Sequence, residues 1–348
     1  MSHPLNNDQR RETVNTRQRY EAFRSAKAQL RHYRGSMVWS RTKDIEYLLR
    51  SAYDGEDGRR RQISLGPRSA ETERIKHEFD TGREAARQRF EATRKVLDRQ
   101  AAINRVLGLG RVPLTGARII HALDEAGLLG RALRVVGTHA IYAYEAAAGI
   151  FVDPDVTTTE DIDLLYDARR ELGFVVDETL GEAGLLGILK RVDRSFERAR
   201  QGFRAVNADG YLVDLIRPEG NPPWKDVRES LSAAEGDLAA VAIEGLAWLE
   251  SAPSFEAVVI DEKGVPLRFV VVDPRVFAAH KLWVSQQPGR DPLKRQRDLA
   301  QARAVAELTA THLTHLPYEA AALRMLPRSV FEAANPLFRA APAQGVAT

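Results

Sequence analysis

The sequence predicts an α+β fold in which helices flank a mixed β-sheet, with an N-terminal region of helices and a small β-meander and a C-terminal helical region. Three observations support this fold class. Predicted strands and helices do not alternate strictly, so the sheet should combine parallel and antiparallel pairs and is not doubly wound. Long segments near the N-terminus carry apolar residues at helical spacing, whereas the middle of the chain has short apolar runs typical of strands. Hydrophobic residues make up 44% of the 348 residues, which is typical of a chain that buries a core.

Residues 1–110 are the first predicted domain, a basic helical region with a small antiparallel sheet. Apolar side chains recur at helical spacing in residues 7–32 and 70–106, and we expect these amphipathic helices to pack as an antiparallel pair. Between them, apolar stretches surround a turn-forming segment at residues 54–58, which predicts the sheet. Ser69, followed by acidic residues, is placed to cap the second helix.

Residues 111–272 are the second predicted domain and should carry the mixed sheet. A Gly- and Pro-bearing stretch at residues 108–116 is the best candidate for a linker before it. Six apolar runs are predicted strands: residues 133–136, 161–166, 203–206, 211–216, 255–260 and 266–272. Four segments are predicted helices: residues 117–126, 139–148, 185–192 and 238–249. The last four strands should form two hairpins.

Residues 273–348 are the third predicted domain, with helical patterns at residues 275–285, 292–312 and 320–326. Charge follows the same division, because the three domains have net charges of +9, −10 and +4. An acidic middle between basic ends suits a site that uses carboxylates to hold a cation and basic surface to contact phosphate. Solvated helix faces are the alternative interpretation of the N-terminal basic excess.

The composition excludes several classes of protein. No cysteine is present, which excludes disulfide frameworks, cysteine-ligated zinc and thiolate nucleophiles. Residues 1–10 are polar and precede further arginines, so we expect no secretory signal. Acidic residues interrupt the longest apolar runs well short of the roughly 20 residues that a bilayer requires. We therefore expect a cytoplasmic protein with no membrane span.

Carboxylates on two predicted strands are the first candidate functional residues. Asp161 and Asp163 alternate with apolar residues, so both side chains should point to the same face of their strand. Asp214 interrupts an otherwise apolar strand, and burying it without a partner would be unfavourable. Like charges this close repel unless a cation lies between them, and Mg²⁺ prefers oxygen ligands. The pattern predicts a metal site at these three residues, with room for two ions.

The stretch around residue 137 supplies the second part of the candidate site. Gly137 ends an apolar strand and permits close approach to the backbone, and Thr138 adds a hydroxyl and an N–H at the start of the next helix. Such a turn is suited to binding phosphate. Neither this turn nor a single Asp-x-Asp is specific alone, but their order, with Asp214 on a later strand, is more specific.

With these residues the sequence resembles the DNA polymerase beta-like nucleotidyltransferase superfamily. The pattern of that superfamily is a strand ending in Gly-Gly or Gly-Ser, then two acidic residues separated by one, then a further acidic strand residue. Here it corresponds to Gly137-Thr138, Asp161-x-Asp163 and Asp214. Threonine replaces the commoner serine and keeps the hydroxyl. The resemblance implies the polymerase beta-like fold, with a mixed sheet flanked by helices.

Further segments are similar to bacterial nucleotidyltransferase-fold proteins over most of the chain. These segments are Val136-Gly-Thr-His-Ala-Ile-Tyr-Ala-Tyr-Glu145, Thr159-Glu-Asp-Ile-Asp-Leu-Leu165 and Ser64-Leu-Gly-Pro-Arg-Ser69. A looser similarity to abortive-infection nucleotidyltransferase toxins comes from residues 273–282 and 294–298. In those toxins a lysine and an aspartate at matching places serve the nucleotide site, which implies the same role for Lys281 and Asp298.

The resemblance implies an enzyme that needs Mg²⁺ (or Mn²⁺) and moves a nucleoside monophosphate from an NTP to an acceptor hydroxyl, with release of pyrophosphate. In this interpretation Asp161, Asp163 and Asp214 ligate metal, and Gly137, Thr138 and Lys281 contact the phosphates. The basic residues 1–110 slightly favour an RNA or tRNA acceptor. The alternative is a nucleic-acid or partner-binding module with an inactive transferase core.

Simpler interpretations stand beside these assignments. The paired aspartates could be surface carboxylates on a strand edge, or part of a calcium loop, although EF-hand spacing is absent. Lys281 could extend from a helix surface into solvent. Asp298 could pair with the basic residues just before it on the same helix. His312 and His315 lie three apart, but no third metal ligand is near, so we interpret them as ordinary histidines.

Overall fold

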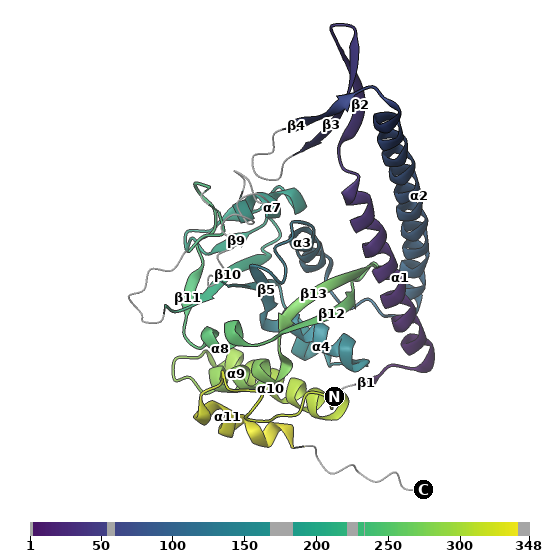
Figure 1. The fold of residues 1–348 in the computed structure, drawn as a ribbon. Coiled ribbons are helices and arrows are strands. Elements are labelled where there is room, and N and C mark those ends of the chain that lie inside the picture. Colours follow the sequence, from purple (N-terminus) through teal and green to yellow (C-terminus); the bar gives the residue numbers. More distant parts are fainter. Residues whose placement is uncertain (1–2, 54–59, 168–183, 221–228, 233, 340–348) are drawn as a thin grey trace.

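The computed structural model describes residues 3–53, 60–167, 184–220, 229–232 and 234–339. An eight-stranded sheet lies in the centre of the molecule with helices on both sides (Figure 1). Two long helices run along one side of this core and carry a small sheet that projects beyond it, and the C-terminal helices pack together at the opposite end (Figure 1). The mixed helix-and-sheet architecture confirms the predicted fold class.

The N-terminal arm, residues 7–106, consists of two helices and a three-stranded meander. Its elements are α1 (Asn7–His32), β2 (Ser36–Thr42), β3 (Ile45–Tyr53), β4 (Arg60–Pro67) and α2 (Ala70–Val106). The strands are antiparallel in the order β2-β3-β4, and the helices lie side by side as predicted (Figure 1). Ser69 caps α2 by accepting a hydrogen bond from the N–H of Thr72. The predicted turn at residues 54–58 lies outside the described residues.

A buried polar network joins the arm to the core. Asn104 on α2 accepts a hydrogen bond from Thr16 on α1 and donates one to the backbone oxygen of Gly264, at distances of 2.9 Å each. Gln100, which is fully buried, donates to Asn104 and to Glu12. Since buried polar groups are stable only when they are paired, this network fixes how the arm packs on the core.

The central sheet has the strand order β12-β13-β5-β7-β10-β9-β8, with β11 paired to the end of β10. Its strands are β5 (Leu133–Val136), β7 (Asp161–Tyr166), β8 (Glu197–Arg198), β9 (Arg204–Val206), β10 (Leu212–Pro218), β11 (Val241–Ile243), β12 (Ser254–Ile260) and β13 (Pro266–Val272). Strands β7 and β10 are parallel, as are β13 and β5, whereas β5 and β7 are antiparallel. The sheet is therefore mixed. A separate short pair joins β1 (His3–Pro4) to β6 (Ile150–Phe151).

Helices cover both faces of the sheet and form the C-terminal end. They are α3 (Leu114–Glu125), α4 (Ala140–Ala148), α5 (Pro154–Thr157), α7 (Gly184–Val192), α8 (Leu246–Ser251), α9 (Pro274–Ser285), α10 (Pro292–His312) and α11 (Arg328–Ala334). Most residues of α4 and α9 are apolar and buried, so these two helices supply much of the core beside the sheet. None of the helices in the described ranges has the length and hydrophobicity needed to cross a bilayer.

Two predicted helices are wrong. Residues 238–249 contain β11 and then α8, because Gly245 takes a φ of 82°, a left-handed conformation that interrupts a helix. Residues 320–326 form turns, and the next helix, α11, begins at Arg328. Pro327 explains this, because a proline disfavours helical geometry in the residue before it.

The predicted linker, residues 108–116, packs closely against the core. The N–H groups of Arg111 and Val112 donate hydrogen bonds to the backbone oxygen of Ile260, and α3 already begins at Leu114. The polypeptide therefore passes from the arm into the core without a long exposed connection.

Candidate active site

The two acidic strands lie next to each other in the sheet. Strand β7 pairs with β10 in parallel, and Asp163 is in register with Asp214. Asp161 lies two residues earlier, opposite Leu212. Ile162 is fully buried, whereas Asp161 and Asp163 are partly exposed, so the alternation predicted for this strand is present. The fold thus brings the carboxylates of three sequence positions to one region of the sheet.

Gly137 lies directly against Asp163. Strand β5 pairs with β7 so that Val136 is opposite Asp163, and Gly137 follows at the strand end with a φ of 65°. A Cβ atom at residue 137 would lie only 2.0 Å from Oδ2 of Asp163. Glycine is therefore required here both by its left-handed backbone and by the neighbouring carboxylate.

The three carboxylates have different partners. Asp214, which is 7% exposed, forms a bidentate ion pair with Arg204 on β9, with both N–O distances 2.6 Å. Asp161 accepts a hydrogen bond from the hydroxyl of Thr159. Among the described residues, no group donates a hydrogen bond to the side chain of Asp163. Burial and the negative charge of Asp161 raise the pKa of Asp163 to about 6.

We next considered whether these residues fit a divalent cation. Within the described ranges, no three His, Asp or Glu side chains are already arranged to hold a metal ion. The reason is local, because Asp214 is turned toward Arg204 and Asp161 toward Thr159. The donor set is nevertheless the oxygen-only set that Mg²⁺ and Mn²⁺ prefer, and among the described residues Asp163 forms no ion pair. The residues fit such a cation if Asp214 exchanges Arg204 for it.

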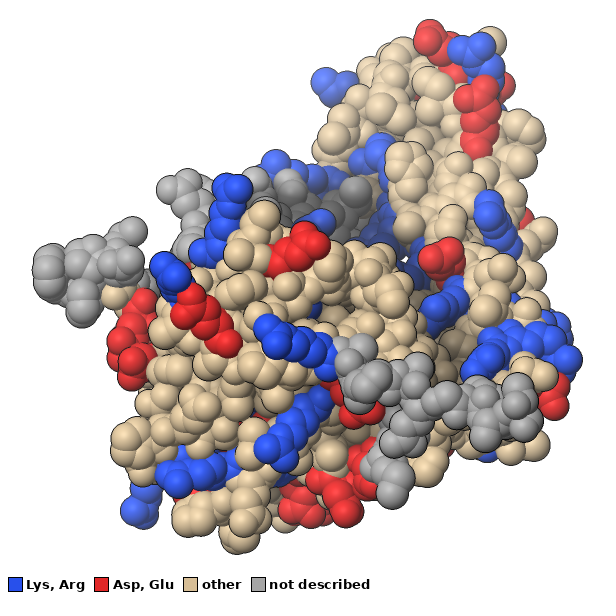
Figure 2. Space-filling view, turned by 90° about the horizontal axis from the view of Figure 1, so that it is seen from below, with Lys and Arg blue, Asp and Glu red and all other residues tan. Residues whose placement is uncertain are grey.

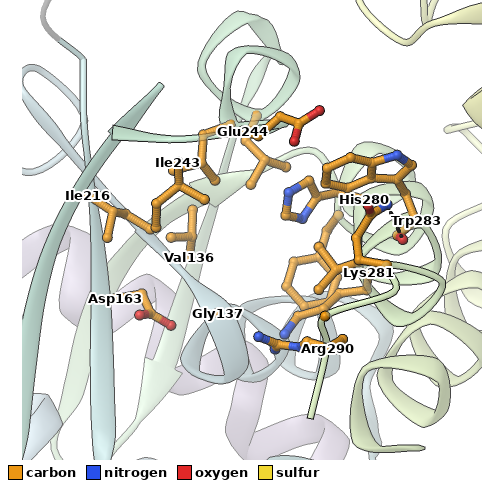
Figure 3. A pocket seen from close by; sticks show the side chains of 16 residues that line it. Val136, Gly137, Asp163, Ile216, Ile243, Glu244, His280, Lys281, Trp283 and Arg290 are labelled. Carbon is orange, nitrogen blue, oxygen red and sulfur yellow. Dashed lines mark hydrogen bonds between the residues drawn. The ribbon is translucent and has the colours of Figure 1, made fainter. Parts of the chain in front are cut away.

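A pocket of about 430 Å³ extends from Asp163 and Gly137 toward α9. Lys281 on α9 and Arg290 in the loop before α10 lie on the wall opposite Asp163 (Figure 3). Asp298 on α10, only 2% exposed, accepts from Nζ of Lys281 at 2.8 Å and from Arg290 at 2.6 and 2.7 Å. The structure therefore places two cations, held by one buried carboxylate, across the pocket from the acidic strands.

This arrangement changes the interpretation of Asp298. The sequence comparison with the toxins suggested a direct role at the nucleotide, and the simpler alternative was pairing with basic residues on its own helix. In the structure its two oxygens are occupied by Lys281 and Arg290. Asp298 is thus a positioning residue for these two cations.

The hydroxyl of Thr138 is also occupied. Its Oγ1 accepts hydrogen bonds from Arg297 and Gln301 on α10, at 3.0 Å each, and Thr138 is 8% exposed. Arg297 also binds the backbone oxygen of Thr158, and Gln301 that of Val156. Helix α10 therefore fastens the turn after β5 to the segment that leads into β7. The side chain of Thr138 has this structural role in the structure, while the backbone of the turn remains beside Asp163.

The sequence analysis missed three side chains that lie at the candidate site. Arg204 could have been found, because the predicted hairpin of residues 203–206 and 211–216 places it opposite Asp214. Arg290 lies in a loop, and His280 on α9 lines the pocket through tertiary packing. For these two no sequence pattern gives a signal.

Comparison with known proteins gives one match. A family model described as nucleotidyltransferase matches residues 115–327, which is more than half of the chain. The matched residues contain β5, β7, β10, α9 and α10, and hence both walls of the pocket, and exclude the arm. No curated protein and no solved structure matches the chain.

Proposed function

Because the chain belongs to the nucleotidyltransferase family, we propose that it moves a nucleoside monophosphate from an NTP to an acceptor hydroxyl and releases pyrophosphate. One observation supports this proposal above the others. Asp163, which is in register with Asp214 and lies beside Gly137, faces Lys281 and Arg290 across a single pocket. A triphosphate with bound cations needs carboxylates that hold the cations and basic side chains that contact the phosphates.

In this proposal the acidic strands hold Mg²⁺ or Mn²⁺. Asp161, Asp163 and Asp214 would hold these cations, and Asp214 would alternatively take the proton of the acceptor hydroxyl. A bound divalent cation would polarise the phosphoryl group and lower the pKa of the acceptor hydroxyl. Release of Asp214 from Arg204 frees its oxygens for this role.

The opposite wall binds the outer phosphates. Lys281 and Arg290 direct their charges into the pocket, and the single carboxylate of Asp298 keeps both side chains in place. Charge develops on the pyrophosphate as it leaves, so a fixed cation stabilises the transition state more than the ground state. The backbone of Gly137 permits close approach of the phosphate from the other side.

The acceptor in this proposal is RNA, with tRNA included, and the arm is its binding surface. A groove of about 300 Å³ between the arm and α3, here called the arm groove, has Phe23, Arg24, Lys27, Arg31 and Arg94 in its lining, together with the carboxylates of Asp98, Asp124 and Glu125. Of its cations, Arg24, Arg31 and Arg94 form no ion pair with a described carboxylate, whereas Lys27 binds Glu125. Lys and Arg side chains also gather around a hollow on the face of the molecule that Figure 2 shows. Unpaired cations beside an aromatic ring suit contacts with phosphates and bases.

Label transfer tests the proposed activity. The full chain would be incubated with each α-labelled NTP, Mg²⁺ or Mn²⁺, and either total RNA or total protein, and label uptake and pyrophosphate release would be measured. We expect uptake into the RNA fraction and a loss of at least about a hundredfold in Asp163→Asn. Asp155→Asn, at an exposed aspartate on α5, is the matched control. Near-normal transfer by Asp163→Asn would show that the acidic strands take no part in the reaction. No uptake by the unmodified chain would favour a binding module with an inactive core.

A further inference from the structure

The pocket has two chemically different ends. Gly137 and Arg290 lie at one end, and Glu244, Ile243 and His280 lie at the other (Figure 3). The second end is mainly apolar and aromatic. Ile243, His280 and Trp283 lie there together with the carboxylate of Glu244, and the pocket lining also includes the apolar Ile216, Leu246 and Leu249. A ligand that fills the whole pocket must therefore be highly polar at one end and largely apolar at the other.

His280 lies within an aromatic cluster at the apolar end. Its ring centroid is 6.1 Å from that of Trp248 on α8 and 6.0 Å from that of Trp283 on α9, and the two indole rings are 5.0 Å apart. Lys281, the next residue on α9, belongs to the phosphate end. A single helix thus carries one residue for each end of the pocket.

One ring nitrogen of His280 has no partner. Its Nε2 is buried, and no described residue forms a hydrogen bond with it. Such buried polar atoms are rare in native structures. Burial, with the nearby charge of Lys281, lowers the pKa of His280 to about 3. The ring is therefore neutral at physiological pH, with one nitrogen as donor and the other as acceptor.

We propose that the apolar end of this pocket binds the base of the nucleoside triphosphate and that His280 is the residue that distinguishes one base from another. This inference rests on the proposed function. A nucleobase is a planar ring with nitrogen and oxygen atoms at its edge, so it matches an apolar and aromatic wall that includes an imidazole with an unsatisfied nitrogen. Bases that offer no complementary edge leave the imidazole unpaired and bind less tightly.

Binding measurements separate the base from the phosphates. The full chain and its variants would be titrated calorimetrically, in Mg²⁺, with ATP, GTP, CTP, UTP and inorganic tripolyphosphate. His280→Phe keeps an aromatic ring and removes both nitrogens. His280→Gln keeps a donor and an acceptor. His315→Phe, at an exposed histidine outside both the pocket and the arm groove, is the matched control.

We expect the unmodified chain to bind one NTP more tightly than the others. His280→Phe should lower the affinity for that NTP by about 10- to 100-fold, the range for one hydrogen bond to a buried group. Tripolyphosphate affinity should stay within about twofold, which also shows that the variant is folded. His280→Gln should keep part of the preference, and His315→Phe should leave NTP binding unchanged.

Equal affinity of the unmodified chain for all four NTPs, or an unchanged preference in His280→Phe, would overturn the assignment of His280. Binding of tripolyphosphate without a gain in affinity from any base would overturn the base subsite and leave the proposed transfer site intact. If neither an NTP nor tripolyphosphate binds the unmodified chain, the proposed function fails and this inference fails with it.

Discussion

The ion pair between Arg204 and Asp214 leads to the sharpest prediction, because it should compete with the metal. Arg204→Met removes the guanidinium and leaves a carboxylate that is 7% exposed beside Asp163. Loss of one partner of a buried pair destabilises a protein by about 3 to 5 kcal/mol. The side chain of Arg204 is 31% exposed, so water replaces part of the interaction. We therefore expect the metal-free variant to lose about 2 kcal/mol of stability.

Divalent metal should reverse this loss. In the unmodified chain a cation must displace Arg204 from Asp214 before it can use that carboxylate, whereas in Arg204→Met the carboxylate is free. We expect Mn²⁺ to bind the variant about tenfold more tightly, which corresponds to about 1.4 kcal/mol of additional stabilisation at saturation. The effect of metal on the free energy of unfolding should thus be larger in the variant than in the unmodified chain.

Urea unfolding, followed by circular dichroism with and without saturating Mn²⁺, measures both effects. Arg198→Met on the neighbouring strand β8 is the matched control, because Arg198 binds a backbone oxygen and no described carboxylate. Adding Asp214→Asn to the Arg204 variant should abolish the extra stabilisation by metal. The reasoning is refuted if Arg204→Met leaves metal-free stability unchanged, or if Mn²⁺ stabilises the variant and the unmodified chain equally.

Three further predictions concern the rest of the site. The pKa of Asp163 is raised from 3.8 to about 6, so its contribution to stability is complete below pH 3.8 and is lost as the pH rises through 6. The metal-free chain should therefore lose up to about 3 kcal/mol between pH 4 and 7 relative to Asp163→Asn, as urea unfolding at several pH values would show. Lys281→Met should slow transfer by about ten- to a thousandfold, and it should also lower the melting temperature because it removes one of the two partners of the buried Asp298; the exposed Lys294→Met is the control, and a lower melting temperature with unchanged kinetics would make Lys281 a structural residue. Replacing the three unpaired arginines of the arm groove by Ala should make the slope of log RNA affinity against log salt concentration smaller by about 2 to 3. The affinity for NTP should not change. An unchanged slope would exclude the arm groove as the RNA-binding surface.

Much of this site was predictable because it depends on short-range patterns. Strand alternation placed Asp161 and Asp163 on one face, and the apolar run around Asp214 identified a third strand. The sequence could not show that β7 and β10 are neighbours in register, because strand order is set by packing of the whole core. Similarity to known families supplied Lys281, but the structure alone shows that it faces Asp163 across a pocket.

Tertiary contacts limit what the sequence can predict. Residues 238–249 have helical composition, yet Gly245 adopts a left-handed conformation, and a Cβ atom there would lie only 2.7 Å from the ring of Trp283. The phosphate role of Thr138 stays a prediction, but the sequence could not show that its hydroxyl has partners about 160 residues later. In both regions a contact with a distant residue matters, and single-sequence patterns do not contain it.

The charges that line the pocket bear on how the proposed cation would take part. Among the described lining residues, Asp163 and Glu244 are carboxylates, and Lys281 and Arg290 carry positive charge. Asp298 binds both of these cations and cancels part of their charge. The positive field in the pocket is therefore weak for a ligand as highly charged as a triphosphate. In the proposed function, a divalent cation held beside Asp163 would then contribute to nucleotide binding as well as to catalysis.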